Sequence, residues 1–221
     1  MMMSNLWQMS KKNVLLLLLL VLILPTASGT AGQAEELAAL LQDVDRAAAE
    51  MRGMSCAFTQ EKELAMFDRP VVFRGKLDLV RPDRLRWEFA SPINSVLIFK
   101  GDSGLRCDGD SPPVRFDLQR DPVMRMVARQ LWLWLGGDHH RLAEEYHLTL
   151  AGAATLLIEP KDPGVAEFVT SLTIDFDPDT HQPRQVEIRE AGGDLTRLVF
   201  HDCQPDPDPD DALFSRCGDG E

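Results

Sequence analysis

The sequence predicts a mainly β protein with a few helices, an α+β chain whose strands run antiparallel. Three observations support this prediction. Short segments of alternating apolar and polar residues recur from residue 56 to residue 200, and turn sequences rich in Gly, Pro and Asp separate them. Only two long segments have the apolar spacing of a helix. Short turns between strands indicate an antiparallel meander, because parallel strands need long crossover connections.

The first 29 residues are expected to form a signal peptide. Lys11 and Lys12 precede an apolar run from Val14 to Leu24, and small residues follow it, which is the order of parts in a secretory leader. The run is shorter than the about 20 residues that span a bilayer. We therefore expect cleavage near Gly29 or Ala31 and a soluble protein outside the cytoplasm. Retention as an uncleaved membrane anchor is the alternative.

The chain is acidic, with a formal net charge of −12. Loss of two lysines and no acid with the signal peptide would take this charge to about −14. Such a protein is not expected to bind nucleic acid, and an anionic membrane surface would repel it. Much of the negative charge lies in residues 203–221, an Asp/Pro-rich segment that suits an extended, solvated tail.

One folded domain is expected over residues 33–202. It begins with a helix over residues 33–52, which ends at Gly53. The apolar residues that share one side of this helix are Leu37, Leu40, Leu41, Val44 and Met51. Strands follow, first over residues 56–64 and then in a hairpin over residues 73–92. Later strands are predicted at residues 96–99, 114–118, 146–150, 156–158, 168–176, 186–188 and 195–200.

A second helix interrupts the strands at residues 122–135. Asp121 suits the N-cap, Pro122 suits the first helical position, and two glycines at 136 and 137 end the pattern. Apolar residues surround nearly the whole helix, so it must be buried or lie between two apolar surfaces. One solution is a strongly curved, incompletely closed barrel with helices over its mouth. A two-layer α+β sandwich with an ordinary core is the alternative, and periodicity does not distinguish them.

Four cysteines in an exported chain make disulfides possible, and three pairings are open. We expect Cys203 and Cys217 to pair, because these two flank one flexible stretch. The alternative is that some of the thiols are free and buried. No CxxC spacing is present, so the sequence offers no support for a zinc ribbon or a thioredoxin-like site.

Catalytic and metal-binding patterns are weak. The GDSG sequence at residues 101–104 resembles the nucleophile segment of trypsin-like proteases, but the first histidine, His139, comes after the serine instead of before it. A hairpin turn explains these residues better. The histidines have no spacing that would place two ligands on one face. No enzyme activity, metal or cofactor is therefore expected, and the sequence favours a binding protein.

The order of motifs resembles the LolA family of periplasmic outer-membrane lipoprotein carriers. FTQEK follows a short helix, then comes GKLDLVRPDRLRWEFASP and then VLIFKGDSGL. The resemblance is strong from Phe58 to about Gly104 and weak afterwards, as in divergent LolA-related proteins. It implies an open antiparallel barrel with a helical lid that binds lipoprotein acyl chains. It also implies two partners, an inner-membrane lipoprotein-releasing transporter and an outer-membrane lipoprotein receptor, and a carrier that works as a monomer.

The resemblance also suggests roles for single residues. Arg81 matches an arginine that holds the lid closed in the family, so we expect it to be a latch. The expected wall of the acyl-chain cavity is Phe73, Leu77, Leu79, Leu85, Trp87 and Phe89. The expected lid residues are Met124, Val127, Leu131, Trp132 and Trp134. Two other functions remain open: a carrier of another lipid or amphiphilic precursor, and a module that binds a partner protein and holds no lipid.

Overall fold

The computed structural model describes residues 28–135 and 139–218, except for the side chains of 28–31, 133, 134, 139 and 140. The chain divides into two compact units, residues 1–36 and 37–221. In the first unit only the start of helix α2 (Ser28–Glu50) is described. Residues 1–27, most of the expected signal peptide, lie outside the described part. Within that part, no helix is long and apolar enough to cross a membrane.

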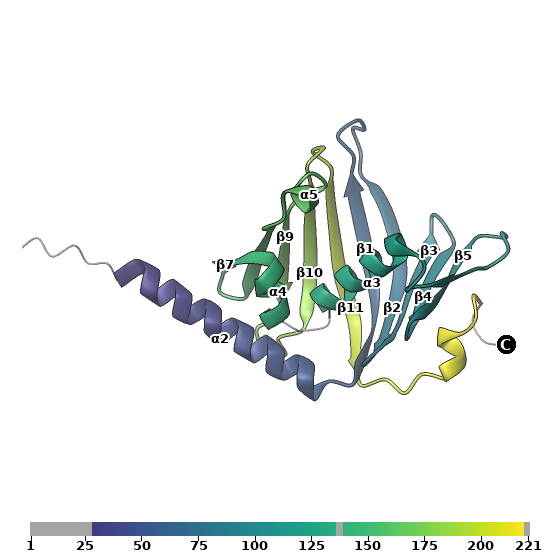
Figure 1. Cartoon of the computed structure of the whole chain (residues 1–221), viewed down its shortest axis with the longest axis horizontal. Coiled ribbons are helices and arrows are strands. Elements are labelled where there is room, and N and C mark those ends of the chain that lie inside the picture. The colour runs from purple at the N-terminus through teal and green to yellow at the C-terminus, as the bar shows by residue number, and fades with distance from the viewer. Residues whose placement is uncertain (1–27, 136–138, 219–221) are drawn as a thin grey trace, which may run out of the picture. The chain divides into compact units, whose positions relative to one another are not determined.

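The second unit contains one sheet of eleven strands, in the order β6-β5-β4-β3-β2-β1-β11-β10-β9-β8-β7. Every pairing is antiparallel. The strands are β1 (Gly53–Glu63), β2 (Val71–Val80), β3 (Arg84–Ser91), β4 (Ser95–Lys100), β5 (Ser103–Asp108), β6 (Val114–Asp117), β7 (Tyr146–Gly152), β8 (Thr155–Pro160), β9 (Val169–Phe176), β10 (Pro183–Glu190) and β11 (Leu195–Pro205). The prediction of a mainly β, antiparallel fold is confirmed. The sheet is open, and its edges are β6 and β7 (Figure 1). The expected strongly curved, incompletely closed barrel is therefore not formed.

The two long predicted helices are present. Helix α3 (Pro122–Leu135) has the expected bounds, and the carboxylate of Asp121 caps it by accepting hydrogen bonds from the amides of Val123 and Met124 at 3.1 and 3.0 Å. Short helices α4 (His139–Glu145), α5 (Pro163–Ala166) and the 3₁₀ helix η1 (Asp211–Phe214) complete the fold. In Figure 1, α3 crosses one face of the sheet.

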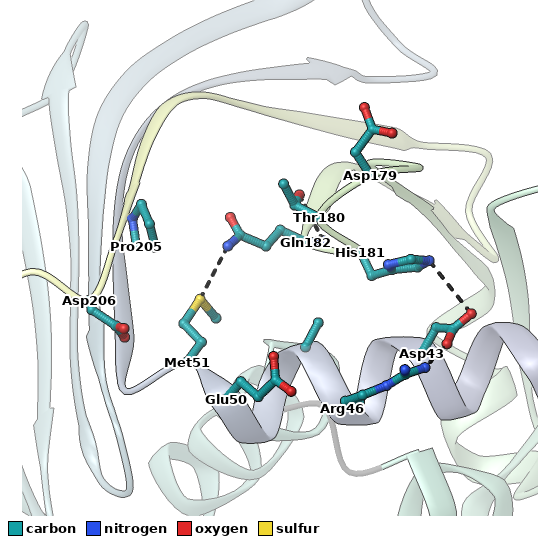
Figure 2. Close-up of a pocket in the computed structure, with 11 residues that line it drawn as sticks. Asp43, Arg46, Glu50, Met51, Asp179, Thr180, His181, Gln182, Pro205 and Asp206 are labelled. Carbon is teal, nitrogen blue, oxygen red and sulfur yellow. Dashed lines mark hydrogen bonds and ion pairs between the residues drawn. The ribbon is translucent and has the colours of Figure 1, made fainter.

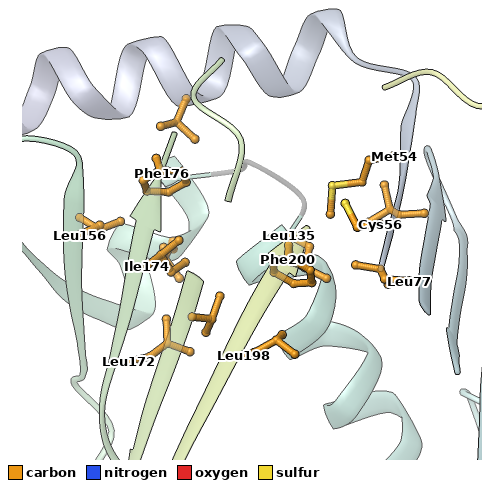
Figure 3. Close-up of a cluster of buried hydrophobic side chains, with 14 of the residues drawn as sticks. Met54, Cys56, Leu77, Leu135, Leu156, Leu172, Ile174, Phe176, Leu198 and Phe200 are labelled. Carbon is orange, nitrogen blue, oxygen red and sulfur yellow. The ribbon is translucent and has the colours of Figure 1, made fainter. Parts of the chain in front are cut away.

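That face of the sheet carries the main apolar core. Alternate residues of the central strands point into it, and α2 and α3 contribute Val44 and Leu135. Figure 3 shows its members from both halves of the sheet, including Leu77 of β2, Leu172 of β9 and Phe200 of β11. The alternation predicted for the hairpin over residues 73–92 is therefore present, with its leucines fully buried.

The opposite face of β2–β5 carries a second apolar cluster, which the C-terminal segment covers. Phe214 of η1 is 2% exposed and packs with Val96, Ile98 and Leu105. Residues 203–205 belong to β11, and residues 210–217 pack on the sheet. The expected solvated tail over residues 203–221 was therefore wrong for these parts. Burial of the Phe214 ring favours docking of the segment, and this gain offsets the preference of the neighbouring aspartates for water.

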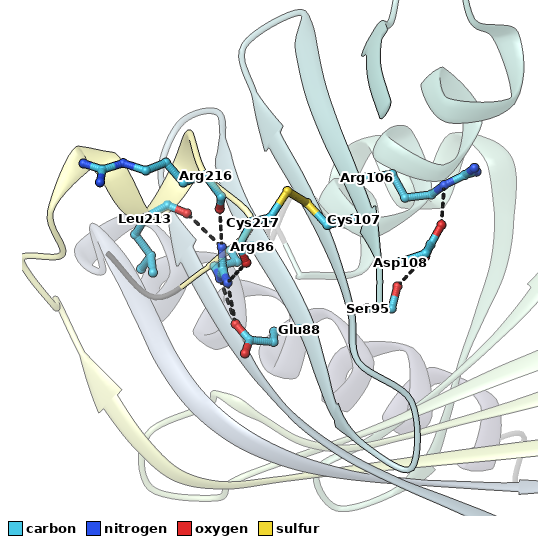
Figure 4. Close-up of a disulfide and its surroundings, with 9 residues drawn as sticks. All are labelled: Arg86, Glu88, Ser95, Arg106, Cys107, Asp108, Leu213, Arg216 and Cys217. Atoms are coloured by element: carbon cyan, nitrogen blue, oxygen red, sulfur yellow. Dashed lines mark hydrogen bonds and ion pairs between the residues drawn. A yellow bond between two sulfur atoms is a disulfide. The ribbon is translucent and has the colours of Figure 1, made fainter. Parts of the chain in front are cut away.

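The disulfide prediction was also wrong. Cys56 of β1 pairs with Cys203 of β11, and Cys107 of β5 pairs with Cys217. Pairing of β1 with β11 places Cys56 beside Cys203, with their Cα atoms 4.2 Å apart. Cys217 then meets Cys107 because the C-terminal segment docks on the outer face of the sheet (Figure 4). Neither proximity follows from distance along the chain.

A buried arginine holds the docked segment. Arg86 on β3 is 1% exposed, although the sequence pattern placed it on the polar side of its strand. Its guanidinium donates hydrogen bonds to the carbonyl oxygens of Leu213, Arg216 and Cys217 at 3.2, 2.8 and 3.1 Å (Figure 4). It also donates to Glu88 from two nitrogens, at 2.9 and 2.7 Å. We call Arg86, Glu88 and these three carbonyls the Arg86 clamp.

Candidate functional site

The six residues expected to form the cavity wall lie on the inner face of β2 and β3, five of them in the core or packed against it and Phe73 beside Phe89. Leu77, Leu79 and Leu85 are fully buried. The aromatic members pack around Phe58: the ring of Trp87 is centred 5.1 Å away and that of Phe89 5.5 Å away. The rings of Phe73 and Phe89 are 5.6 Å apart. These side chains therefore fill the space on the inner face of β2 and β3.

Gly75 makes room for this aromatic cluster. A Cβ atom at this position would lie 1.9 Å from the carbonyl oxygen of Glu88 and 2.5 Å from the ring of Phe58. No side chain fits there, so the glycine of this strand is required by packing.

The predicted lid residues lie on helix α3. Met124, Val127, Leu131 and Trp132 are partly buried and pack against the main core. The side chain of Trp134 lies outside the described residues. The helix therefore presents these four residues to the core, whereas Val123 and Met126 on the same helix are exposed.

A large apolar cavity lies beside this cover. Its volume is about 610 Å³, within the range of about 300–1,000 Å³ that is typical of small-molecule sites. Residues of α3, β7–β9 and the α5 region line it. They are Met126, Val127, Gln130, Leu131, Tyr146, Ile158, Pro160, Asp162, Gly164, Val165, Phe168, Val169 and Leu172. Two predicted lid residues, Val127 and Leu131, are among them, and none of the six predicted wall residues is.

Few polar groups reach this cavity. The hydroxyl of Tyr146 donates a hydrogen bond to the side-chain oxygen of Gln130 at 2.8 Å. Burial raises the pKa of the Tyr146 phenol, while the hydrogen bond with Gln130 acts in the opposite direction. The phenol is therefore neutral at neutral pH, and the site contains no fixed charge from this residue.

Arg81 lies at the C-terminal end of α3. Its Nη2 atom is 3.5 Å from the carbonyl oxygen of Leu135, the last residue of the helix. Burial lowers the pKa of the guanidinium, but an arginine side chain remains charged at neutral pH. A cation near a helix C-terminus is favourable because the helix dipole is negative there.

A second, polar pocket of about 560 Å³ lies between α2 and the β9–β10 turn. His181 Nε2 is 3.8 Å from a carboxylate oxygen of Asp43, and the amide of Gln182 donates to the sulfur of Met51 at 3.5 Å (Figure 2). Charged and polar side chains that already contact one another surround this pocket. It is unsuited to an acyl chain, and within the described residues no group of His, Cys, Asp or Glu could hold a metal ion.

The GDSG sequence forms a turn, as predicted. β4 ends at Lys100 and β5 begins at Ser103, and Gly101 adopts a positive φ of 59°. A glycine is favoured in this backbone conformation.

An open antiparallel sheet with an apolar cavity beside a helix is a site suited to an apolar ligand. The chain belongs to the LolA family: the family model described as outer membrane lipoprotein carrier protein LolA matches residues 49–217. An outer-membrane lipoprotein carrier protein from Chromohalobacter salexigens is 28% identical over 193 residues, which are 86% of this chain and 85% of that protein. Proteins of this family are periplasmic carriers and not enzymes, and two disulfides agree with an extracytoplasmic location.

Solved structures share the fold at low sequence identity. A crystal structure of MucB has a TM-score of 0.50 and 16% identity, over 84% of this chain and 63% of MucB. A LolA superfamily protein from Nitrosomonas europaea has a TM-score of 0.41 and 13% identity, over 80% of this chain and 96% of that one. The likeness to MucB supports the fold and says nothing of the ligand.

Proposed function

We propose that this protein is a periplasmic carrier that shields the acyl chains of a lipoprotein and takes them from the inner to the outer membrane. The supporting observation is the apolar cavity of about 610 Å³ beside α3, in a chain of the LolA family. Each methylene group withdrawn from water contributes about 0.8 kcal/mol. A long acyl chain therefore binds strongly to an apolar cavity without needing any charged contact.

The carrier acts between two partners in this proposal. After signal-peptide cleavage it works as a monomer, receives cargo from an inner-membrane lipoprotein-releasing transporter and gives it to an outer-membrane lipoprotein receptor. No metal, cofactor or nucleic acid takes part.

Movement of α3 would enlarge the cavity. Val127 and Leu131 line the cavity and also pack against the core that contains Leu77 and Trp87. If α3 lifts from the sheet, the cavity joins the space above β2 and β3, and the sheet curves around the cargo. The six predicted wall residues would then contact the acyl chains, which makes them a second region of the same site.

In this proposal Arg81 is a latch that favours the closed position of α3. Its guanidinium contacts the carbonyl oxygen of Leu135 at 3.5 Å, and in this proposal cargo binding overcomes that contact. We expect Arg81→Leu to retain bound lipid in a transfer assay with the purified receptor. Arg84→Leu, beside the same turn, is the control. Transfer by Arg81→Leu at the rate of the unaltered protein would contradict the latch.

The cavity is tested by filling it. Val169 lines the cavity at the start of β9, and Val169→Trp places a large side chain there. We expect binding of a fluorescent acyl-chain probe to weaken by about tenfold or more. Val114→Trp, at a half-exposed position on β6, is the matched control. Equal binding by both variants would contradict the proposed cavity.

The cargo is identified by native mass spectrometry with lipid extraction on protein purified from the periplasm. A triacylated lipoprotein at one per chain supports the lipoprotein carrier. A free lipid or pigment precursor would instead indicate a carrier of another amphiphile. A chain that stays empty when acyl chains are offered would indicate a module that binds a partner protein.

A further inference from the structure

Exposed apolar side chains gather at one end of the sheet. Among the described residues, eight large apolar side chains are exposed, and two of them, Val123 and Met126, lie on α3. The other six are Met66, Phe67, Ile93, Val114, Val165 and Phe168. All six lie at or beside the β1–β2, β3–β4, β5–β6 and β8–β9 connections. Because the strands are antiparallel, these four connections lie at the same end of the sheet.

Four of these residues lie on neighbouring connections. The amide of Ala65, in the β1–β2 turn, donates to a carboxylate oxygen of Asp194 in the β10–β11 turn at 2.9 Å. The amide of Ala191, in the same turn, donates to the carbonyl oxygen of Phe168 at 3.0 Å. The β10–β11 turn thus links the β1–β2 turn to the start of β9. We call Met66, Phe67, Val165 and Phe168 the apolar rim; the first, second and fourth are 81%, 59% and 73% exposed.

The apolar rim continues into the apolar cavity. Val165 and Phe168 are exposed at the surface and also line the cavity. An acyl chain that passes the rim therefore meets apolar side chains from the surface inward. The acyl chain is therefore exposed to water only briefly during entry. This lowers the cost of transfer, because exposure of apolar surface to water is unfavourable.

We propose that the apolar rim docks on the surface of a phospholipid bilayer and places the cavity mouth at the lipid interface. The partner is lipid, because the rim side chains form two pairs on two connections, and one pair, Val165 and Phe168, continues into the apolar cavity. Shallow insertion into the headgroup region suits such side chains, whereas a stable protein interface needs a continuous packed surface. This inference rests on the proposed function, since it explains how an apolar chain reaches the cavity.

Vesicle flotation tests the docking with the full mature chain. The vesicles are phosphatidylcholine, with a second set that contains about one quarter phosphatidylglycerol. We expect the unaltered protein to float with phosphatidylcholine vesicles, and the double variant Met66→Ser, Phe67→Ser to lose about tenfold in partitioning. Val123→Ser, an equally exposed apolar position on α3, is the matched control and should float normally. The conservative Phe67→Leu should also float.

Binding of the fluorescent acyl-chain probe is measured in solution alongside vesicle flotation. The two measurements together distinguish failure of the docking from failure of the carrier function. Met66 and Phe67 do not line the cavity, so their double variant should bind the probe normally, which also shows that it is folded. Docking is overturned if the unaltered protein does not float, if the rim variant floats like Val123→Ser, or if flotation requires a membrane protein in the vesicles. Failure of the unaltered protein to bind the probe would instead overturn the proposed carrier function.

Discussion

Removal of the Arg86 guanidinium should destabilise the fold far more than removal of an exposed arginine. Arg86→Met keeps much of the aliphatic volume and deletes the five hydrogen bonds of the Arg86 clamp, two with Glu88 and three with backbone carbonyls. Hydrogen bonds to charged groups are worth about 1.5–3 kcal/mol each, but they do not add when they share one donor group.

The expected loss in the free energy of unfolding is about 3–5 kcal/mol, the range for breaking a buried charge pair. Arg86 is 1% exposed, and Glu88 is mostly buried beside it. Without the guanidinium, the carboxylate of Glu88 loses its ion-pair partner. The three carbonyl oxygens of the docked segment lose their hydrogen-bond donor and can regain one only by contact with water. The Cys107–Cys217 disulfide still tethers the segment, so we expect it to detach from the sheet while staying attached covalently.

Urea denaturation followed by circular dichroism measures the loss, and hydrogen exchange of residues 210–217 reports detachment. Arg106→Met is the matched control, because Arg106 on β5, two strands from β3 in the same sheet, makes an exposed ion pair with Asp108 at 3.0 Å (Figure 4). Such a pair contributes about 0–1 kcal/mol. Equal losses for the two variants, both below about 1 kcal/mol, would refute the clamp.

Three other variants test single features of the fold. Gly75→Ala should cost about 1–3 kcal/mol of unfolding free energy, because a Cβ would lie 1.9 Å from a carbonyl oxygen of β3. Loss of the Cys56–Cys203 disulfide, which closes a separation of 147 residues, should cost about 2–5 kcal/mol in urea. A hydrogen bond from Lys100 lowers the pKa of Asp211, so docking of η1 should weaken as the pH falls below about 3.9, measured by hydrogen exchange.

Each of these has its own control. Gly192, where a Cβ would meet nothing within 4 Å, is the comparison for Gly75, and equal stability of the two alanine variants would contradict the packing argument. The disulfide variant lacks only Cys56–Cys203, whereas the reduced protein lacks both disulfides. When Cys107 is also replaced in the variant, the variant and the reduced protein should unfold at the same urea concentration. For Asp211 the sign follows from a lowered folded-state pKa: the contact is complete above the ordinary value and is lost on acidification. Asp211→Asn should remove this pH dependence.

Local patterns predicted the two long helices and every strand except β5 (Ser103–Asp108), and they indicated the family. Alternation over residues 73–92 predicted β2 and β3, and Asp121 with Pro122 predicted the start of α3. These predictions succeed because side-chain direction in a strand and amide capping in a helix depend on residues close in the chain. The FTQEK and Arg-Pro motifs likewise indicated the LolA family, which the match over residues 49–217 confirms.

Contacts between distant residues were decided by the tertiary structure. The partner of Cys203 is Cys56 because β1 lies beside β11, and Arg86 is buried because residues 213–217 return across the outer face of β3. The apolar cavity is formed by α3, β8 and β9, whereas the sequence pointed to the aromatic hairpin. The sequence by itself determined the two long helices, most of the strands and which of their faces are apolar. Only the tertiary structure decided which apolar surfaces fill one another and which leave a cavity, because that depends on how separate elements pack in three dimensions.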